Sequence, residues 1–268
     1  MKISLFLLIP LSLLIFSSCS GDDDASPDFP PELLEVKAEL EARYDQMNAD
    51  LSTRVSYFAQ VGIDTAEVRS HLVELYGATD FVTNFAHVNS DRILQLIEPE
   101  QYYDSQGADI SDQAHVIEAF STQEPVLSDV FTAVEGYQAV VCIHPIVQNE
   151  EVLGTLNALF LPEELLGDII SPLTENDDFE IWVMESTGYI LFDDDSEEIG
   201  LNLFTDPLYE DFPDLIEAGH LIVSQEEGET TYTFFQSGTS DPITKRAHWK
   251  TFSRHGNQWK VVLVSPEN

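Results

Sequence analysis

The sequence predicts an α+β protein, in which a long N-terminal helix is followed by two stacked modules, each built on an antiparallel sheet. Three observations support this fold class. A helical stripe of apolar residues comes first, short alternating strands replace it after Gly77, and the same order of elements then occurs twice. We place the helical part at 32–76, the first module at 77–172 and the second module at 173–268.

The long helix is expected between Glu32 and Gln60, where apolar residues recur at spacings of three and four. Pro30-Pro31 precede it and Gly62 follows it, which is typical of helix ends. With a length of about 43 Å, it must run alongside both modules or pair with another helix. A second helix is predicted from Thr65 to Tyr76, with Asp64 as its cap. The stripe consists of Leu33, Val36, Leu40, Tyr44, Met47, Leu51, Val55 and Phe58.

Both modules have the same predicted order, namely a hairpin, a helical insert and then a meander of two or three strands. In the first module, strands are expected at 81–88, 92–97, 126–132, 137–147 and 152–160, and helices at 112–120 and 162–170. In the second module, strands are expected at 179–185, 189–192, 230–236, 246–253 and 259–265, and helical pieces at 207–218.

Residues 1–18 have the pattern of a secretory signal. Lys2 precedes an apolar run from Ile3 to Phe16, which is too short to span a bilayer as a helix. Ser17-Ser18-Cys19 resembles the lipobox of lipoproteins, although Phe16 stands where that pattern prefers Leu, so we expect a lipid anchor on Cys19. The alternative is ordinary cleavage near Cys19. Residues 19–31 are then an acidic tether, and the protein is expected on the outer face of the cell membrane, in the periplasm or at the cell surface.

The composition is strongly acidic, with 49 Asp and Glu residues against 11 Lys and Arg. Such a surface repels phosphate backbones, so no nucleic-acid partner is expected. Because 43% of the residues are hydrophobic, the chain is expected to fold rather than to remain disordered. The only cysteine besides Cys19 is Cys142, which lies in an apolar run and is expected to be a small buried hydrophobic residue.

Short motifs in both modules resemble those of tandem Cache proteins, the extracytoplasmic PAS-like sensor family with a long N-terminal helix and two stacked modules. Each motif is degenerate alone, but their order and spacing match over roughly residues 32–266. The motifs are Gly107–Ser111, Pro125–Val130, His144-Pro145-Ile146, Val152–Leu156, Ser186–Leu191, Glu198-Ile199-Gly200, Glu227–Tyr232 and Trp259–Leu263.

The resemblance implies that the membrane-distal module, here the first, holds a small ligand of the amino acid, organic acid or amine class. One subset of the family binds amino acids through an Arg-x-Trp-Tyr element and an Asp on the last strand. In this sequence these positions fall at Gln113, His115, Val116 and about Leu159, and none of them matches. The resemblance therefore does not identify the ligand.

Candidate ligand-binding residues are therefore chosen by their position on the covering helix and the strands of the first module. For each of them a place in the core, or a local hydrogen bond, is the alternative. If His115 or His144 contacts the ligand, binding should vary between pH 5 and 8. The candidates are His115, Asp129, Phe131, Tyr137, His144 and Asn157.

No pattern in the sequence indicates catalysis, a cofactor or a metal. The acidic segment from Asp193 to Glu198 lacks the Gly and Glu of a calcium-binding loop, and we interpret it as a solvated turn. The histidines do not have zinc-ligand spacing, and nucleophile-elbow, phosphate-loop and dinucleotide motifs are missing. We therefore expect no enzyme activity.

Together these patterns predict a lipid-anchored, small-molecule-binding, sensor-like protein without its own output domain. Such a protein must signal through a partner, either a membrane receptor or kinase or a second copy docked on the N-terminal helix. The alternative for that helix is that its stripe packs on the chain's own modules. The alternative functions are a solute-binding lipoprotein that delivers to a transporter and a structural surface protein.

Overall fold

The computed structural model describes residues 28–174, 179–236 and 239–267. The predicted signal peptide (1–18), Cys19 and most of the predicted tether lie outside the described residues. Within these ranges, none of the helices combines the length and the apolar character that crossing a membrane requires.

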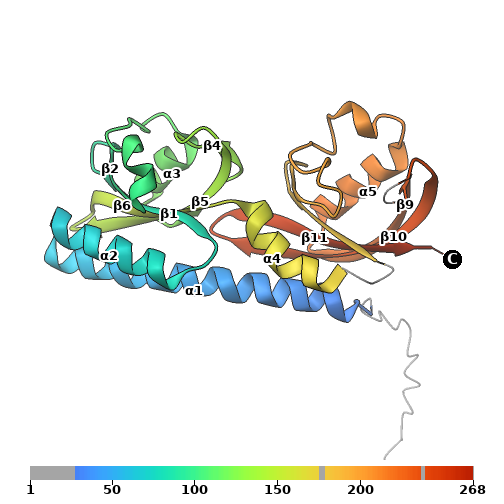
Figure 1. Cartoon of the computed structure of the whole chain (residues 1–268), viewed down its shortest axis with the longest axis horizontal. Coiled ribbons are helices and arrows are strands. Elements are labelled where there is room, and N and C mark those ends of the chain that lie inside the picture. Colours follow the sequence, from blue (N-terminus) through green and yellow to red (C-terminus); the bar gives the residue numbers. More distant parts are fainter. Residues whose placement is uncertain (1–27, 175–178, 237–238, 268) are drawn as a thin grey trace, which may run out of the picture.

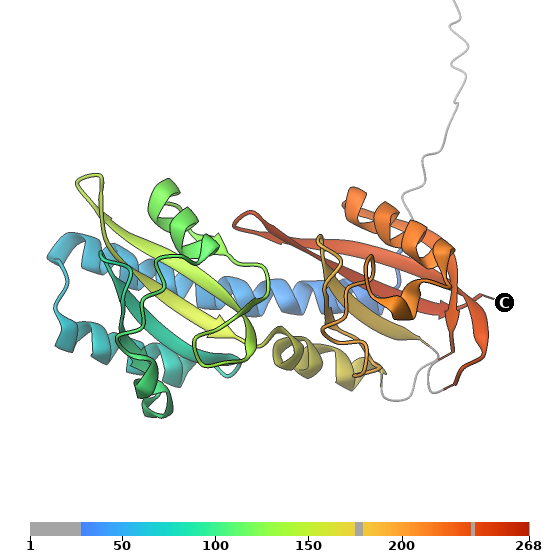
Figure 2. The same ribbon diagram turned by 90° about the horizontal axis from the view of Figure 1, so that it is seen from above.

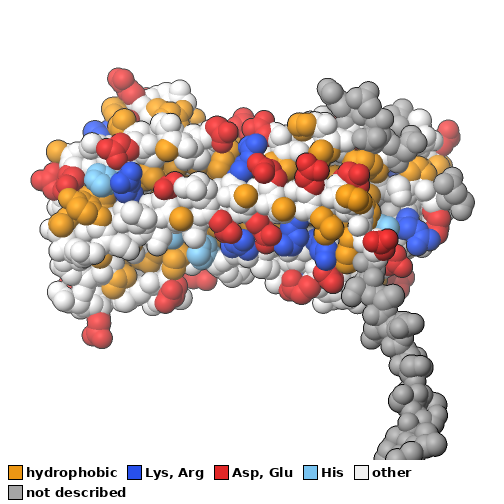
Figure 3. Space-filling view, turned by 90° about the horizontal axis from the view of Figure 1, so that it is seen from below, with side chains coloured by type: hydrophobic (Ala, Val, Ile, Leu, Met, Phe, Trp, Pro, Cys, Tyr) orange, Lys and Arg blue, Asp and Glu red, His pale blue; other side chains and the backbone are white. Residues whose placement is uncertain are grey.

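Helix α1 (Pro31–Val61) runs along the base of the molecule beneath both modules (Figure 1). Every residue of the predicted stripe except Val55, which is half-buried, is buried against the chain's own sheets. Its outer face is charged: Lys37 pairs with Glu41 at 2.8 Å, and acidic and basic side chains alternate along this side (Figure 3). The stripe therefore packs on the two modules. Helix α2 (Thr65–Ala78) follows, and the carboxylate of Asp64 caps it as predicted.

The first module contains an antiparallel sheet with the strand order β2-β1-β6-β5-β3, and β4 pairs with β5 beside it. Helices α1 and α2 cover one face, and α3 (Ala114–Thr122) and 3-10 helix η1 (Glu100–Ser105) lie on the opposite side (Figure 1). The strands are β1 (Val82–Asn89), β2 (Leu94–Glu98), β3 (Val126–Leu127), β4 (Phe131–Thr132), β5 (Gln138–Gln148) and β6 (Glu151–Phe160).

One predicted strand, 126–132, is interrupted in the structure between β3 and β4. The side-chain amide of Asn257 in the second module donates to the carbonyl of Ser128 at 2.7 Å and to Asp129 Oδ1 at 3.1 Å. The hydroxyl of Ser128 accepts the backbone N–H of Val141 at 3.0 Å. These bonds hold the segment in a different path from that of a strand, and they depend on residues far away in the sequence.

The second module contains an antiparallel sheet with the order β8-β7-β11-β10-β9. Helix α4 (Pro162–Thr174) links the modules, and η2 (Pro207–Tyr209) and α5 (Pro213–Ser224) cover the face away from α1. The hairpin of β10 and β11 is long, and its tip reaches the first module (Figure 2). The strands are β7 (Glu180–Glu185), β8 (Ile190–Phe192), β9 (Glu227–Phe235), β10 (Pro242–Arg254) and β11 (Asn257–Pro266).

The hydrophobic core has three parts. One lies between the helices and the inner faces of both sheets, so α1 joins the modules through shared apolar contacts. The other two lie inside the modules, between each sheet and the segments that cover its outer face. The predicted α+β class, with a long helix and two antiparallel sheets, is confirmed. The two inner spaces are where a ligand could be enclosed.

Candidate functional site

The first module encloses a cavity between its sheet and the segments covering it, α3 and the loop after β4. We call it the first cavity. Asn84 and Ala86 face it because alternate residues of β1 point to the same side, and Asn157 faces it from β6, paired with Ala86. Its volume is about 40 Å³, which accommodates about three water molecules. The other lining residues are Leu94, Ile97, Ile110, Gln113, His115, Val116, Phe131, Ala133, Val134, Glu135, Val141 and Leu159.

Two polar atoms on the wall of the first cavity have no hydrogen-bond partner among the described residues. They are Nδ2 of Asn84, whose side chain is only 2% exposed, and Oε2 of Glu135. The hydroxyl of Tyr137 also makes no hydrogen bond of good geometry, although Tyr102 and Asn84 lie near it and Ser105 lies near the carboxyl group of Glu135. An unpaired buried polar group costs about 1–3 kcal/mol, so a bound molecule that pairs these atoms would recover that energy.

The charge of the first cavity comes from Glu135, whose pKa is raised by burial. His115 is neutral at pH 7, since burial lowers its pKa to about 4. Its Nε2 lies 2.9 Å from Oε1 of Gln113, and its ring lies 4.2 Å from that of Phe131. The described lining residues include no Lys or Arg. The cavity therefore offers an acceptor with negative charge and neutral donors, but no cation.

Comparison with known proteins agrees with this architecture. Residues 42–162, which include most of α1 and the whole first sheet, match the family model described as "HK/GC/Chemotaxis protein-like, sensor domain". An extracellular ligand-binding receptor from Desulfohalobium retbaense superposes with a TM-score of 0.75 and 26% identity over 90% of this chain. The chain spans 41% of that receptor. None of the curated protein sequences matches the chain.

Two further structures share the fold at low identity. The periplasmic sensory domain of the Campylobacter jejuni chemoreceptor Tlp1 has a TM-score of 0.65 and 12% identity, over 88% of this chain and 92% of that one. The ligand-binding domain of the Pseudomonas aeruginosa amino acid chemoreceptor PctB, in complex with L-Arg, has a TM-score of 0.62 and 11% identity, over 88% and 92%. The chain has the tandem Cache fold of extracytoplasmic sensor domains. These likenesses establish the fold, and the family model for sensor domains matches residues 42–162 of the chain.

The structure places the candidate residues of the first Cache module in three regions. His115, Phe131 and Asn157 line the first cavity, and Tyr137 lies beside it. Asp129 lies in an open groove next to it, where it accepts the bond from Asn257. His144 lies on the opposite face of the sheet, against α1, with its Nε2 at 2.8 Å from Asn48 Oδ1.

The second Cache module encloses a larger cavity of about 140 Å³, which we call the second cavity. Six of its polar side chains are paired with one another. Lys245 Nζ lies 2.6 Å from Glu180, the hydroxyl of Tyr209 donates to Glu198 at 2.8 Å, and Trp182 donates to Tyr232 at 3.3 Å. The lining residues include Glu180, Trp182, Asp193, Glu198, Leu203, Tyr209, Leu215, Tyr232, Phe234 and Lys245.

The interpretation of 193–198 as a solvated turn is wrong at both of its ends. Asp193 and Glu198 face the second cavity, and burial raises the pKa of both carboxyl groups. Asp195 and Glu197, between them, are exposed as expected. The sequence does not show this, because η2 and α5, which cover the cavity, follow later in the chain.

Sequence reasoning also missed Asn84 and Glu135, which carry the unpaired atoms of the first cavity. A signal existed for Asn84, because it is a polar residue on the same face as Ala86 and Val88 within a mostly buried strand. Glu135 lies beside a glycine turn, where an acidic residue is ordinarily solvated. Only the fold shows that this turn closes over the sheet.

Proposed function

We propose that this sensor domain binds a small amine in the first cavity. The observation that carries the proposal is the pair of unpaired atoms on the cavity wall, Asn84 Nδ2 and Glu135 Oε2. Asn84 requires a ligand acceptor and Glu135 requires a ligand donor. Structural relatives bound to L-Arg, GABA and L-alanine also carry ligands with an amino group, which supports this class.

The lining charge favours an amine over an organic acid. A buried ammonium group pairs with the carboxylate of Glu135, whereas a buried carboxylate finds no Lys or Arg among the described lining residues. A hydroxyl or carbonyl oxygen on the same ligand would accept from Asn84. The ligand we infer is therefore a small primary amine that also carries one uncharged oxygen acceptor.

The volume limits both the size and the affinity of the ligand. A cavity for about three water molecules fits a ligand of roughly four non-hydrogen atoms. Very small ligands gain at most about 1.5 kcal/mol per atom, which gives about −6 kcal/mol and a Kd of tens of micromolar. Screening must therefore use millimolar concentrations.

We further propose that Cys19 carries a lipid that holds the domain on the outer face of the membrane, as the Ser17-Ser18-Cys19 motif suggests. Because such a lipid enters only one leaflet, the signal would pass by contact with a second protein. Mass spectrometry of the mature N-terminus tests the anchor. Acylated Cys19 is the expected species, and an unmodified N-terminus would contradict this part of the proposal.

A thermal-shift screen of small amines, amino acids and organic acids at millimolar concentration tests the ligand class. Binding to the native state raises the melting temperature, so amines should raise it while organic acids of equal size should not. The Asn84→Leu variant should lose this response and yet be more stable by about 1 kcal/mol, because an unpaired buried amide is removed. Such a trade of stability for binding is typical of a functional site.

Asn157→Leu is the matched control for stability, since the Asn157 amide oxygen accepts from Thr155 at 2.7 Å and its loss should destabilise the fold. Organic acids that stabilise the protein when amines do not would overturn the amine assignment. A response that survives Asn84→Leu unchanged would place the ligand elsewhere.

A further inference from the structure

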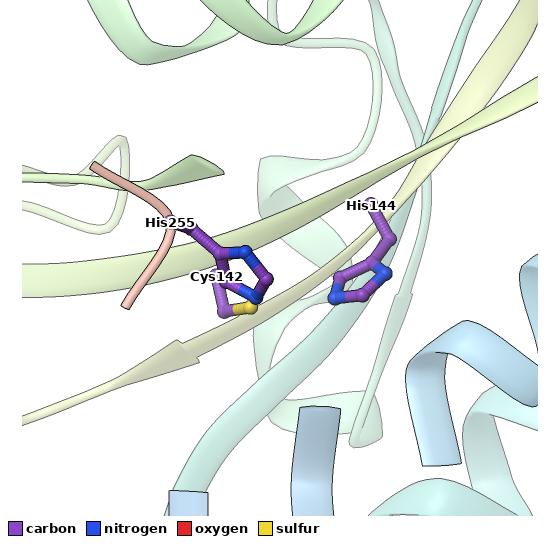
Figure 4. Close-up of side chains that lie close together, drawn as sticks. All are labelled: Cys142, His144 and His255. Atoms are coloured by element: carbon purple, nitrogen blue, oxygen red, sulfur yellow. The ribbon is translucent and has the colours of Figure 1, made fainter. Parts of the chain in front are cut away.

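A second cluster of potential ligand atoms lies outside both cavities, where the two modules meet. The side chains of Cys142, His144 and His255 lie close together (Figure 4), and one potential ligand atom from each lies within 4.8 Å of the other two. Among the described residues they are the one such group of three. We propose that they form a binding site for a soft metal ion, with Cu⁺ as the preferred ion.

Strand geometry places two of the ligands. Cys142 and His144 are alternate residues of β5, so both point toward α1, and both are buried. The thiol accepts a hydrogen bond from the hydroxyl of Tyr44 on α1, with an oxygen–sulfur distance of 3.2 Å. The first module therefore supplies a sulfur and an imidazole on one face.

The third ligand comes from the second module. His255 lies in the turn between β10 and β11, and its backbone has a positive φ of 46°. Two neighbours hold the turn in place. Arg254 donates to both carboxylate oxygens of Asp45 on α1 at 2.7 and 2.8 Å, and Asn257 donates to the carbonyl of Ser128 at 2.7 Å. Because both sides of the turn are tied down, His255 is positioned rather than free in solvent.

The two imidazoles share one partner in the structure. Nε2 of His144 and Nε2 of His255 lie 2.8 and 2.6 Å from Oδ1 of Asn48. Their ring centroids are 5.6 Å apart and their planes are nearly perpendicular. Imidazole nitrogen and cysteine sulfur are common ligands of soft metal ions in proteins.

The spacing is close to that of a metal site. Bonds of about 2.0 Å to nitrogen and 2.3 Å to sulfur hold neighbouring ligand atoms about 3.5 Å apart. The three ligand atoms therefore have to approach one another by about an ångström, which rotation of the side chains can supply.

Charge decides between the metals. Thiolate and imidazole ligands suit both Cu⁺ and Zn²⁺. When a metal–sulfur bond forms, the Cys142 thiol proton leaves to solvent, and the site contributes one negative charge. Cu⁺ then gives a neutral complex, whereas Zn²⁺ leaves one positive charge in a buried position, which is costly. A metal bound here would also connect β5 of the first module to the hairpin of the second.

Anaerobic titration of the purified protein with Cu⁺, in competition with a chromogenic chelator, tests the site. We expect one ion per chain, tighter binding of Cu⁺ than of Zn²⁺, and a higher melting temperature with Cu⁺. Cys142→Ser and His255→Gln should each weaken binding by more than the roughly 10–100-fold typical of losing an outer-shell partner. His115→Gln, a histidine of the first module outside the cluster, is the matched control and should bind normally.

Two results would overturn the proposal. One is the absence of stoichiometric Cu⁺ binding by the folded wild-type protein. The other is binding that depends on Cys142 but is unchanged in His255→Gln, because that pattern describes a lone thiol rather than a three-ligand site. His255 is only half-buried, so this variant should fold even if Cys142→Ser does not.

Discussion

The two modules share a fold but enclose different cavities. The first cavity is small, about 40 Å³, and leaves Asn84 and Glu135 with unpaired polar atoms. The second cavity is larger, about 140 Å³, and its charged groups are joined to one another through Lys245–Glu180 and Tyr209–Glu198. Of these two cavities, the second would be favoured by volume alone.

Under the proposed function, the pairing of polar groups, rather than volume, separates the ligand-binding cavity from the other one. A polar group that already has a partner must lose it before it can bind a ligand. An unpaired group gains a hydrogen bond to the ligand without first losing one to the protein. We therefore interpret the polar network of the second cavity as part of the stability of its module, and the first cavity as the recognition site.

The largest expected effect tests the network of the second cavity. Lys245→Met removes a side chain that is only 6% exposed and leaves Glu180 beside Asp193 and Glu198 without this cation. Breaking a buried pair on one side is strongly destabilising, and we expect a loss of about 3 kcal/mol in the free energy of unfolding, measured with denaturant. Lys250→Met, which breaks the more exposed pair with Glu227, is the control and should cost less than about 1 kcal/mol. Equal losses in the two variants would argue against a structural role for the second-cavity network.

The next effect compares one titrating group from each module. Burial lowers the pKa of His115 from its ordinary value of 6.5 to about 4. The contribution of the neutral ring to folding stability is therefore complete above pH 6.5 and is lost as the pH falls toward 4. Burial and, to a smaller extent, the charge of Asp129 raise the pKa of Glu185 to about 7. Ionised Glu185 therefore lowers the folding stability above pH 7, and this cost is relieved as the pH falls toward 4.5.

Between pH 8 and pH 5, a fall in pH therefore lowers folding stability through His115 and raises it through Glu185. Over this range we expect His115→Gln to gain about 2 kcal/mol relative to wild type, and Glu185→Gln to lose about 2 kcal/mol relative to wild type. Unfolding free energies at several pH values measure both differences. Parallel changes in the two variants would contradict the assigned shifts.

A matched pair of Tyr→Phe substitutions should have the smallest effect. Tyr209 donates to Glu198 at 2.8 Å, so Tyr209→Phe should cost about 1–2 kcal/mol. The Tyr137 hydroxyl makes no hydrogen bond of good geometry, so Tyr137→Phe should be neutral or slightly stabilising. Chemical denaturation of the two variants in parallel gives the comparison. A larger loss for Tyr137→Phe would mean that the first cavity is internally satisfied.

Much of the fold could be predicted from periodicity. The predicted helix 32–60 differs from α1 by one residue at each end, and the Asp64 cap was correctly identified. These features are local, because each depends on side chains within a few turns of one helix. The break between β3 and β4 depends on Asn257, and the buried position of Asp193 depends on helices that follow it. Neither is visible in a local pattern.

The sites were less predictable for the same reason. His115, Phe131 and Asn157 line the first cavity because they lie on elements whose position the pattern indicates. Cys142 and His144 are alternate residues of one strand, but nothing in the spacing pointed to His255, which lies on a hairpin of the other module. When the ligands of one metal site come from two modules, they are far apart in the sequence and form no short motif.

Calorimetric titration of the best amine from the screen into matched variants tests the central claim most directly. Glu135→Gln removes the carboxylate of the first cavity, and Glu198→Gln removes one carboxylate of the second. A hydrogen bond to a charged group contributes about 1.5–3 kcal/mol, so we expect Glu135→Gln to weaken binding at least about 10-fold and Glu198→Gln to leave the Kd unchanged. The reverse result, with binding lost in Glu198→Gln and kept in Glu135→Gln, would place the ligand in the second module and contradict the account.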